Sequence, residues 1–436
     1  MRAMIQRVRA RVFYGWWIAA AGAVMQATVA VLLNQSFGTY AKVLRDDFGW
    51  SKTLFSAAFS MARVETGFLG PVEGWLIDRF GPRTIMRIGV IVLGIGLLLF
   101  SQIRTPWMFL TAFLVMSVGA SFASFMPVSV AIVNWFERRR ARALSILSLG
   151  MASGGLLVPV MVLSIESIGW RKTAFASSLL VIAIGLPLSM VMRHRPAAYG
   201  MHRDGIDPAR AAADAAAPPA PRAADFTAKQ ALRTSAFWLV ALGHGSALLI
   251  VSALQVHLVL HLTENLGYSL ARAGSLVAFL TLMQFCGQGL IGVVGDRWNK
   301  RGIIVACMAM HSVAILLLAY ATTFWMVGAF AVLHGLAWGA RGPLMSAIRA
   351  DYFGGENFGT IMGTSSLIAA IGTTTGPLVA GILADRTGNY QSGFTVLAVL
   401  AVLGSTFFIL ARPPRHPGGA LPIAVDAREP AAAPAR

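Results

Sequence analysis

Charged residues and cysteine are both scarce in this chain. Asp, Glu, Lys and Arg make up 12% of its 436 residues, whereas hydrophobic residues make up 56%. Soluble domains carry about 25% charged residues, so a chain with this few cannot cover a surface that faces water on all sides. The two cysteines, Cys286 and Cys307, both fall in apolar runs, which excludes a disulfide framework. We expect no cofactor and no metal site.

Long apolar runs take the place of the missing charges. A helix that crosses the hydrocarbon core needs about 20 apolar residues, and its backbone groups must bond to one another because lipid offers no partners. The sequence therefore predicts an all-α integral membrane protein with twelve transmembrane helices. Their expected ranges are roughly 14–36, 53–77, 84–103, 106–134, 143–167, 173–192, 235–260, 269–294, 302–320, 324–348, 360–384 and 392–411.

One ten-residue stretch, Gly74–Arg83, recurs as Gly292–Arg301. The two first glycines are 292 − 74 = 218 residues apart, and Asp78 and Asp296 are 296 − 78 = 218 residues apart. This offset is half of the 436-residue chain. Because a repeat this long indicates whole duplicated halves, we expect two pseudo-symmetric six-helix bundles.

Composition divides the chain into four parts. Residues 1–192 form the first predicted bundle, and residues 235–411 form the second. Between them, residues 193–234 are rich in Ala, Pro, Arg and Asp. Such a segment cannot build a core, which predicts a flexible cytoplasmic linker. Residues 412–436 carry several prolines and are predicted to form a disordered cytoplasmic tail.

The basic residues gather on one side of the predicted membrane. A net charge of +18 would suit a nucleic-acid partner, but Lys and Arg concentrate in alternate loops, such as those around Arg79 and Arg138. Short loops rich in Lys and Arg stay in the cytoplasm. The pattern therefore predicts a multi-pass protein of the cell inner (plasma) membrane with both termini in the cytoplasm. Its expected partner is the lipid bilayer and not nucleic acid.

The repeated stretch carries a known signature. Gly74–Arg83 matches G-x-x-x-D-R-x-G-x-R fully, and Gly292–Arg301 matches it with Asn299 in place of the second glycine. On this signature the chain resembles the major facilitator superfamily of transporters. It is further similar to bacterial relatives of monocarboxylate transporters and oxalate/formate exchangers in three segments, namely Tyr14–Trp17, Trp135–Ala143 and Ala198–Met201.

The resemblance implies a mechanism for the whole chain. Superfamily members hold a small-molecule substrate between two bundles and expose it to each side of the membrane in turn. The chain has no G-x-x-x-x-G-K-[ST] loop for ATP, so the expected energy source is an ion or substrate gradient, and a monomeric carrier is expected. The resemblance also implies gating roles for Gly74, Asp78, Arg79, Gly81, Arg83, Gly292, Asp296, Arg297 and Arg301.

Two arginines fall inside predicted spans. Arg63 lies near the middle of 53–77, and Arg341 lies in 324–348 beside Gly342 and Pro343, which predicts a loosened helix at that point. A charge in the membrane is unfavourable by at least about 2.5 kcal/mol and so usually has a function. Because Arg binds carboxylates in a planar, two-pronged geometry, we predict that Arg341 and Arg63 bind a small organic anion. The alternative is a structural role, such as pairing with a buried carboxylate.

Three residues are candidates for coupling transport to protons. Glu65 lies in the second predicted span, and His244 and His257 lie in the seventh. Buried carboxyl groups and histidines can both exchange protons near neutral pH. The alternative for each of the three is a structural role, which single histidines in such positions more often have. Glu73, near the inner end of its span, is assigned to the gate.

The leading hypothesis is secondary active transport of small, monocarboxylate-like organic anions by proton symport or anion exchange. Efflux of hydrophobic or cationic compounds is the alternative, although Arg63 and Arg341 argue against a cationic cargo. A non-transporting membrane sensor is a third possibility. An enzyme is not expected, because the sequence has no nucleophile-and-base set at usable spacing.

Overall fold

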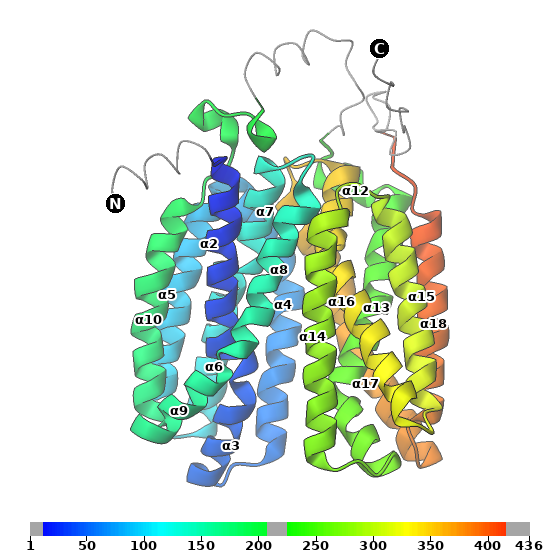
Figure 1. The fold of residues 1–436 in the computed structure, drawn as a ribbon. Coiled ribbons are helices and arrows are strands. Elements are labelled where there is room, and N and C mark those ends of the chain that lie inside the picture. Colours follow the sequence, from blue (N-terminus) through cyan, green and yellow to red (C-terminus); the bar gives the residue numbers. More distant parts are fainter. Residues whose placement is uncertain (1–11, 207–224, 416–436) are drawn as a thin grey trace, which may run out of the picture.

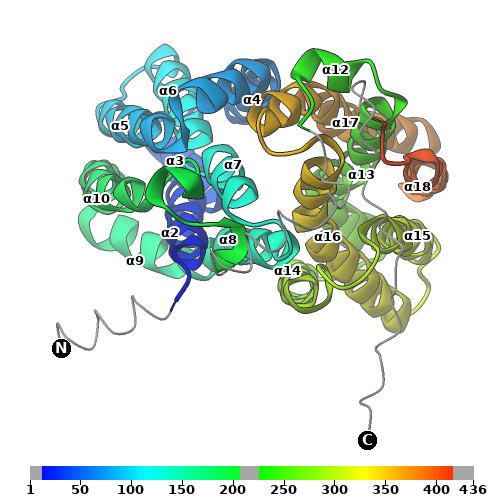
Figure 2. The same cartoon turned by 90° about the horizontal axis from the view of Figure 1, so that it is seen from above.

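The computed structural model describes residues 12–206 and 225–415, which form two bundles of helices (Figure 1, Figure 2). Helix α2 begins and α18 ends at the same end of the molecule, called the terminal end below (Figure 1). The first bundle consists of α2 (Tyr14–Val29), η1 (Ala30–Gln35), α3 (Phe37–Phe48), α4 (Lys52–Phe80), α5 (Pro82–Ser101), α6 (Pro106–Ala123), α7 (Phe125–Trp135), α8 (Arg140–Leu156), α9 (Val158–Ile168) and α10 (Trp170–Val191). The second consists of α13 (Ser235–Leu260), η4 (His261–Asn265), α14 (Leu270–Val294), α15 (Lys300–Ala319), α16 (Phe324–Phe353), α17 (Phe358–Thr387) and α18 (Gln391–Leu410).

All twelve predicted crossings are helical. Ten helical stretches in the described ranges are long and apolar enough to cross a membrane. The other two crossings are α4 and α16, which have 29 and 30 residues but carry the arginines that the sequence placed inside the membrane. The predicted all-α membrane fold of two bundles is confirmed.

Some helix boundaries differ from those predicted. The first crossing continues past residue 36 to Phe48, through the π-helical turn η1. The loosened helix predicted at Arg341 is wrong, because α16 is one continuous α-helix from Phe324 to Phe353. Its glycines serve packing instead: a methyl group on Gly339 would overlap the carbonyl of Gln284 on α14.

The two bundles meet closely along α4 and α17. A methyl group on Gly74 would overlap the carbonyl of Gly359, and one on Gly363 would overlap the carbonyl of Gly70. Small residues let helix backbones approach each other in a membrane, where packing replaces the hydrophobic effect as the force that joins helices. On the other side of the molecule, α8 of the first bundle packs against α14 of the second.

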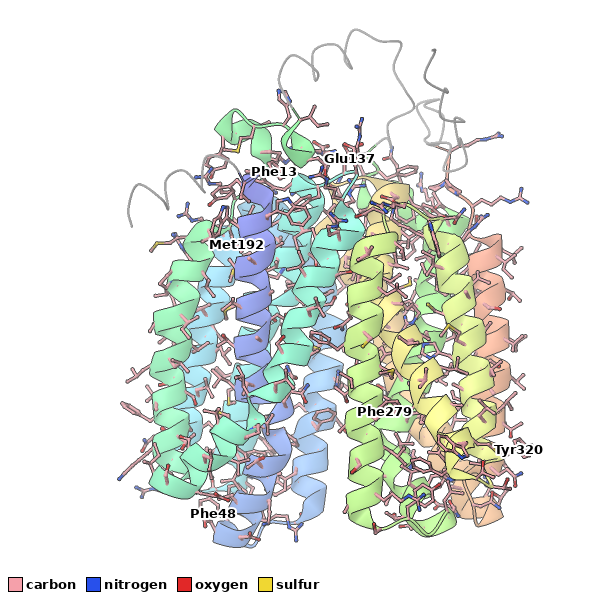
Figure 3. The ribbon with its side chains drawn as sticks, in the orientation of Figure 1. Phe13, Phe48, Glu137, Met192, Phe279 and Tyr320 are labelled. Atoms are coloured by element: carbon pink, nitrogen blue, oxygen red, sulfur yellow. The ribbon has the colours of Figure 1, made fainter. Side chains whose placement is uncertain are left out.

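The predicted linker, residues 193–234, holds three short helical turns in its described parts. These are η2 (Pro196–Tyr199), η3 (Arg203–Gly205) and α12 (Ala228–Leu232). Residues 207–224 of the linker lie outside the described residues, as do residues 416–436 of the predicted tail. Figure 3 places Phe13, Met192 and Glu137 at the terminal end, and Phe48 and Tyr320 toward the opposite end.

Candidate functional site

A cavity of about 290 Å³ lies between the bundles and is called the basic cavity below. Its charged or titratable lining side chains are Arg63 and Glu73 from α4, His244 from α13 and Arg349 from α16. Hydroxyl and amide groups surround them. These polar lining residues are Gln26, Asn34, Thr66, Ser117, Ser121, Ser124, Ser365 and Ser366.

Arg349 is held by three neighbours. Its Nη2 donates to Nδ1 of His244 at 2.9 Å and to Oγ of Ser365 at 2.7 Å, and its Nη1 donates to the carbonyl of Met345 at 2.9 Å. Only 2% of the residue is exposed. No described carboxylate forms an ion pair with it. A buried arginine without a counter-charge is costly, so its charge is available to an anion that enters the cavity.

Glu73 lies in the wall of the basic cavity and not in the gate to which the sequence analysis assigned it. Its Oε2 accepts a hydrogen bond from Ser121 of α6 at 2.6 Å. Its Oε1 is buried and has no hydrogen-bond partner among the described residues. One oxygen of this carboxyl group therefore has no described hydrogen-bond partner at the cavity wall.

The two arginines predicted to bind substrate lie in different places. Arg63 lines the basic cavity, and its guanidinium lies 4.8 Å from the centroid of the Phe59 ring. Arg341 does not line the basic cavity or the second, apolar cavity described below, and only 1% of it is exposed. Its Nε and Nη1 atoms have no hydrogen-bond partner among the described residues. The structure therefore brings Arg63 together with Arg349, and not with Arg341.

The three proton-coupling candidates also separate. His244 lines the basic cavity and accepts from Arg349. Glu65 lines neither cavity and accepts from the hydroxyl of Thr66 at 3.2 Å. His257 lies between Tyr390, at 3.2 Å from its Nδ1, and the carbonyl of Pro377, at 2.9 Å from its Nε2. Because that carbonyl can only accept, Nε2 donates to it and Nδ1 accepts from the Tyr390 hydroxyl. The two bonds join α13 to α17 and to the residue that precedes α18.

A second cavity of about 650 Å³, called the apolar cavity below, lies beyond the basic cavity toward the opposite end. No Asp, Glu, Lys or Arg among the described residues lines it. Its polar groups are mainly Gln35, Gln255, Gln284 and His334. The remaining lining is largely aliphatic and aromatic, and includes Val251, Leu254, Leu258, Val277, Leu282, Phe285 and Trp338.

The repeated aspartates join the two bundles at the terminal end. Asp78 accepts from the backbone amides of Gly359 at 3.0 Å and Thr360 at 2.7 Å, at the start of α17. Asp296 accepts from the amides of Ala141 at 2.7 Å and Arg142 at 3.1 Å, at the start of α8. A helix N-terminus stabilises a carboxylate through its free amides and its dipole. Burial raises the pKa of Asp296, and the bonds from these amides oppose the rise.

The pseudo-symmetry extends to the partners of these aspartates. The offset of 218 that relates Asp78 to Asp296 also relates Ala141 to Gly359, since 359 − 141 = 218. Each bundle therefore contributes one aspartate, and the helix N-terminus of the opposite bundle binds it. All hydrogen bonds found between the bundles among the described residues lie at the terminal end, where Asp351 also pairs with Arg140 at 3.0 Å. This arrangement closes the terminal end.

The signature arginines for which contacts are found, Arg79 and Arg301, make them within their own halves. Arg79 lies over the rings of Trp75 and Phe80, and Arg301 donates to the carbonyl of Ala411 at 3.3 Å. Arg83 has a buried Nε without a partner among the described residues, and Arg297 is exposed. Gly81 has φ of +82°, which favours glycine. Asn299 has φ of −62° and accepts from the amide of Gly302, so the second copy needs no glycine there.

Two aspartates of the predicted linker hold the turns that precede α8 and α17. Asp204 accepts from the amides of Glu137 at 3.0 Å and Arg138 at 2.8 Å. Asp225 accepts from the amides of Gly355 at 2.7 Å and Glu356 at 3.1 Å. The two turns are again 355 − 137 = 218 residues apart. The linker is thus attached to both helices whose N-termini bind Asp78 and Asp296.

We expect Asp225→Ala to lower the stability of the protein. The change leaves two amides without their acceptor, and a donor that loses its partner costs about 1–3 kcal/mol when water cannot replace it. Thermal unfolding in detergent measures the effect. Glu356→Ala is the control, because it removes only an exposed ion pair with Arg195, worth about 0–1 kcal/mol. Equal melting temperatures for the two variants would contradict the assigned role of Asp225.

Comparison with known proteins agrees with this arrangement of helices. The family model of the Major Facilitator Superfamily matches residues 17–263 and 240–434. The chain belongs to this superfamily. Members of the major facilitator superfamily are carriers and not enzymes, so this protein is a multi-pass membrane transporter of small molecules.

Individual relatives in the superfamily are distant. The Fujikurins efflux protein of Gibberella fujikuroi is 25% identical over 350 residues, which cover 79% of this chain and 70% of that protein. Human Monocarboxylate transporter 7 is 23% identical over 457 residues, covering 92% of this chain and 86% of that protein. The crystal structure of the human organic anion transporter MFSD10 superposes with a TM-score of 0.67 at 18% identity, covering 91% of this chain and 99% of that one. At this identity the likeness extends to the major facilitator fold alone.

Sequence reasoning missed Arg349 as a site residue. The predicted span ended at residue 348, so Arg349 was counted with the basic loop that follows. The structure extends α16 to Phe353 and buries Arg349 beside the cavity. A signal was present in the sequence, because Tyr352 and Phe353 continue the apolar pattern beyond the arginine.

Proposed function

We propose that this transporter carries organic anions with a carboxylate group across the plasma membrane by alternating access, through proton symport or anion exchange. The observation that supports this most is the basic cavity, which holds Arg63 and Arg349 without an ion-paired carboxylate among the described residues. Arg forms two-pronged bonds with carboxylates, and the cavity's serines can supply further hydrogen bonds. The relative named as a monocarboxylate transporter is consistent with this cargo.

We assign the terminal end to the cytoplasm. Exposed or partly exposed basic residues adjoin the helix ends on this side, namely Arg79 in α4, Arg138 before α8, Arg233 after α12 and Arg297 after α14, as the positive-inside rule requires. The gating aspartates close the same end. On this assignment the structure represents an outward-facing state, in which anions would enter from outside the cell.

Uptake into proteoliposomes tests the proposed cargo. Radiolabelled mono- and dicarboxylates would be compared with a lipophilic cation, with protein-free vesicles as the background. The proposal expects protein-dependent uptake of at least one monocarboxylate. Uptake of the cation alone, with no carboxylate above background, would contradict it.

Export of a hydrophobic compound is the second candidate function. The apolar cavity and the relative named as an efflux protein both favour it. The same vesicles distinguish the two functions when a neutral hydrophobic compound is added to the panel. Transport of this compound without any carboxylate would favour export.

Glu73 is the proposed proton carrier. It is the one carboxyl side chain among the described residues that lines the basic cavity, and its Oε1 is free to hold a proton. The negative charge of an ionised Glu73 would be attracted to Arg63 and Arg349 and would weaken their attraction for the substrate carboxylate. A protonated Glu73 would leave both arginines to the anion, so that one proton and one carboxylate would cross together.

We expect Glu73→Gln to uncouple transport from protons. Glutamine mimics the protonated acid, so anion exchange should continue while an inward proton gradient no longer drives accumulation. Uptake with and without a pH gradient measures the difference. Glu65→Gln is the matched control on the same helix and should keep the gradient dependence. Gradient-driven accumulation by Glu73→Gln at the wild-type level would rule out Glu73 as the carrier.

A further inference from the structure

The basic and apolar cavities adjoin each other. Asn34 lines the basic cavity and Gln35, the next residue of η1, lines the apolar cavity. On α8, Met151 lines the first and Ala152 the second. Two separate elements of the first bundle thus pass from one cavity to the other within a single residue. The two cavities therefore border each other along these two elements.

The two cavities have opposite chemistry. The basic cavity contains two arginines and many hydroxyl groups, whereas the apolar cavity has no Asp, Glu, Lys or Arg among its described lining residues. Phe285 of α14 is 39% exposed, so its ring can contact a ligand. The indole ring of Trp338 packs near His334, with ring centroids 6.2 Å apart.

The size of the apolar cavity constrains what fills it. Its volume of about 650 Å³ lies within the roughly 300–1,000 Å³ range of cavities that hold drug-sized ligands. An acid of two or three carbons whose carboxylate lies at the arginines would leave this space to water. An apolar group attached to the carboxylate would instead bury its surface against Val251, Leu254 and Phe285, which is favourable.

A second charge at the far end of the substrate would be unfavourable. No Lys or Arg among the described residues lines the apolar cavity, and moving an unpaired carboxylate out of water is costly. The glutamines Gln35, Gln255 and Gln284 offer amide groups, which can bond a neutral polar substituent. The cavity therefore discriminates against dicarboxylates more than against neutral polar groups.

From this juxtaposition we propose that the substrate is an amphipathic monocarboxylate, with one carboxylate at Arg63 and Arg349 and an aromatic or branched apolar body in the apolar cavity. The inference rests on the proposed function and narrows its substrate class. It separates this transporter from carriers of small acids such as formate, acetate or lactate. It also separates it from carriers of dicarboxylates.

Isothermal titration of the purified full-length protein tests the class with three matched acids. Acetate carries the carboxylate alone, phenylacetate adds an aromatic ring, and 4-carboxyphenylacetate adds a second charge at the far end of that ring. All are ionised at pH 7, so the headgroup is constant. We expect phenylacetate to bind at least about tenfold more tightly than acetate, since hydrophobic pockets discriminate by about 10–200-fold. 4-Carboxyphenylacetate should lose that gain.

Two variants of α14 locate the effect. Phe285→Ala should reduce the ratio of phenylacetate to acetate affinity by about tenfold or more, within the range expected for lost apolar contact. Phe279→Ala is the control, because this aromatic on the same helix lines neither cavity (Figure 3). Equal changes in the two variants would overturn the assignment of the apolar cavity.

The possible outcomes separate the inference from the proposed function. Equal binding of acetate and phenylacetate, or tight binding of 4-carboxyphenylacetate, would overturn the substrate class while leaving carboxylate transport in place. No binding of any of the three acids, together with no carboxylate uptake in vesicles, would overturn both.

Discussion

Replacement of Arg349 by glutamine is expected to abolish measurable carboxylate transport. Arg349 is buried at the basic cavity and has no described ion-pair partner. In the complex, Arg349 would pair with the carboxylate of the substrate. Removing one partner of a buried charge pair costs about 2–5 kcal/mol, which corresponds to a loss in substrate affinity of at least about 30-fold. Titration with the best-transported carboxylate measures this loss.

Two further variants show whether the charge or the position matters. Arg349→Lys should keep part of the affinity, because lysine retains the charge but loses the two-pronged geometry. Arg341→Gln should change stability more than affinity, because Arg341 lines neither cavity. The sequence predicted Arg341 as a substrate ligand, and that prediction is decided by this comparison. If Arg341→Gln loses affinity while Arg349→Gln keeps it, the assignment of the site is wrong.

The replacement of Gly74 by alanine is expected to impair transport strongly, whereas Gly292→Ala should be tolerated. These glycines occupy the same position of the repeated signature. A methyl group at Gly74 would overlap the backbone carbonyl of Gly359, but one at Gly292 would lie 3.4 Å from the side chain of Ser145. Overpacking of this kind costs about 1–3 kcal/mol. The cost falls on the closed terminal end, because α4 and α17 meet there across the two bundles.

Protection of the terminal end measures the effect of these glycine variants. A cysteine introduced at Leu76, which packs in one cluster with Phe358 of α17, would be probed with a membrane-impermeant thiol reagent, after replacement of Cys286 and Cys307. We expect faster labelling in Gly74→Ala than in the parent, and an unchanged rate in Gly292→Ala. Identical labelling rates in both variants would show that contact between α4 and α17 does not hold the terminal end closed.

The number of crossings and the two-bundle arrangement could be predicted from the sequence, because they depend on composition and on the spacing of the internal repeat. Twelve apolar runs and an offset of 218 predict two membrane bundles with little dependence on detail. The repeated signature also singled out Asp78 and Asp296, and the gating role that the family resemblance implies for them stays a prediction. Their actual partners, the amides that start α8 and α17, required knowledge of which helices from different bundles lie together.

The site was harder to predict because it depends on where helices end and on the direction in which each side chain points. Arg349 lies one residue beyond the predicted end of its span, and boundaries carry errors of about two to four residues. Glu73 was assigned to the gate from its depth along α4, yet its side chain points to Ser121 and the cavity. Arg341 lies within α16 as expected, but it is buried and lines neither cavity. The position of a residue along its helix can be read from the sequence. The direction of its side chain depends on how the helices pack.

The measurement that tests the account most directly is counterflow in proteoliposomes. Vesicles would be loaded with the unlabelled carboxylate that shows the greatest uptake, and a trace of the same labelled acid would be added outside. If one anion site between the bundles is exposed to each side in turn, the label should accumulate transiently above its equilibrium level, and Arg349→Gln should abolish this excess. Label that only approaches equilibrium, at the rate seen in protein-free vesicles, would contradict the account.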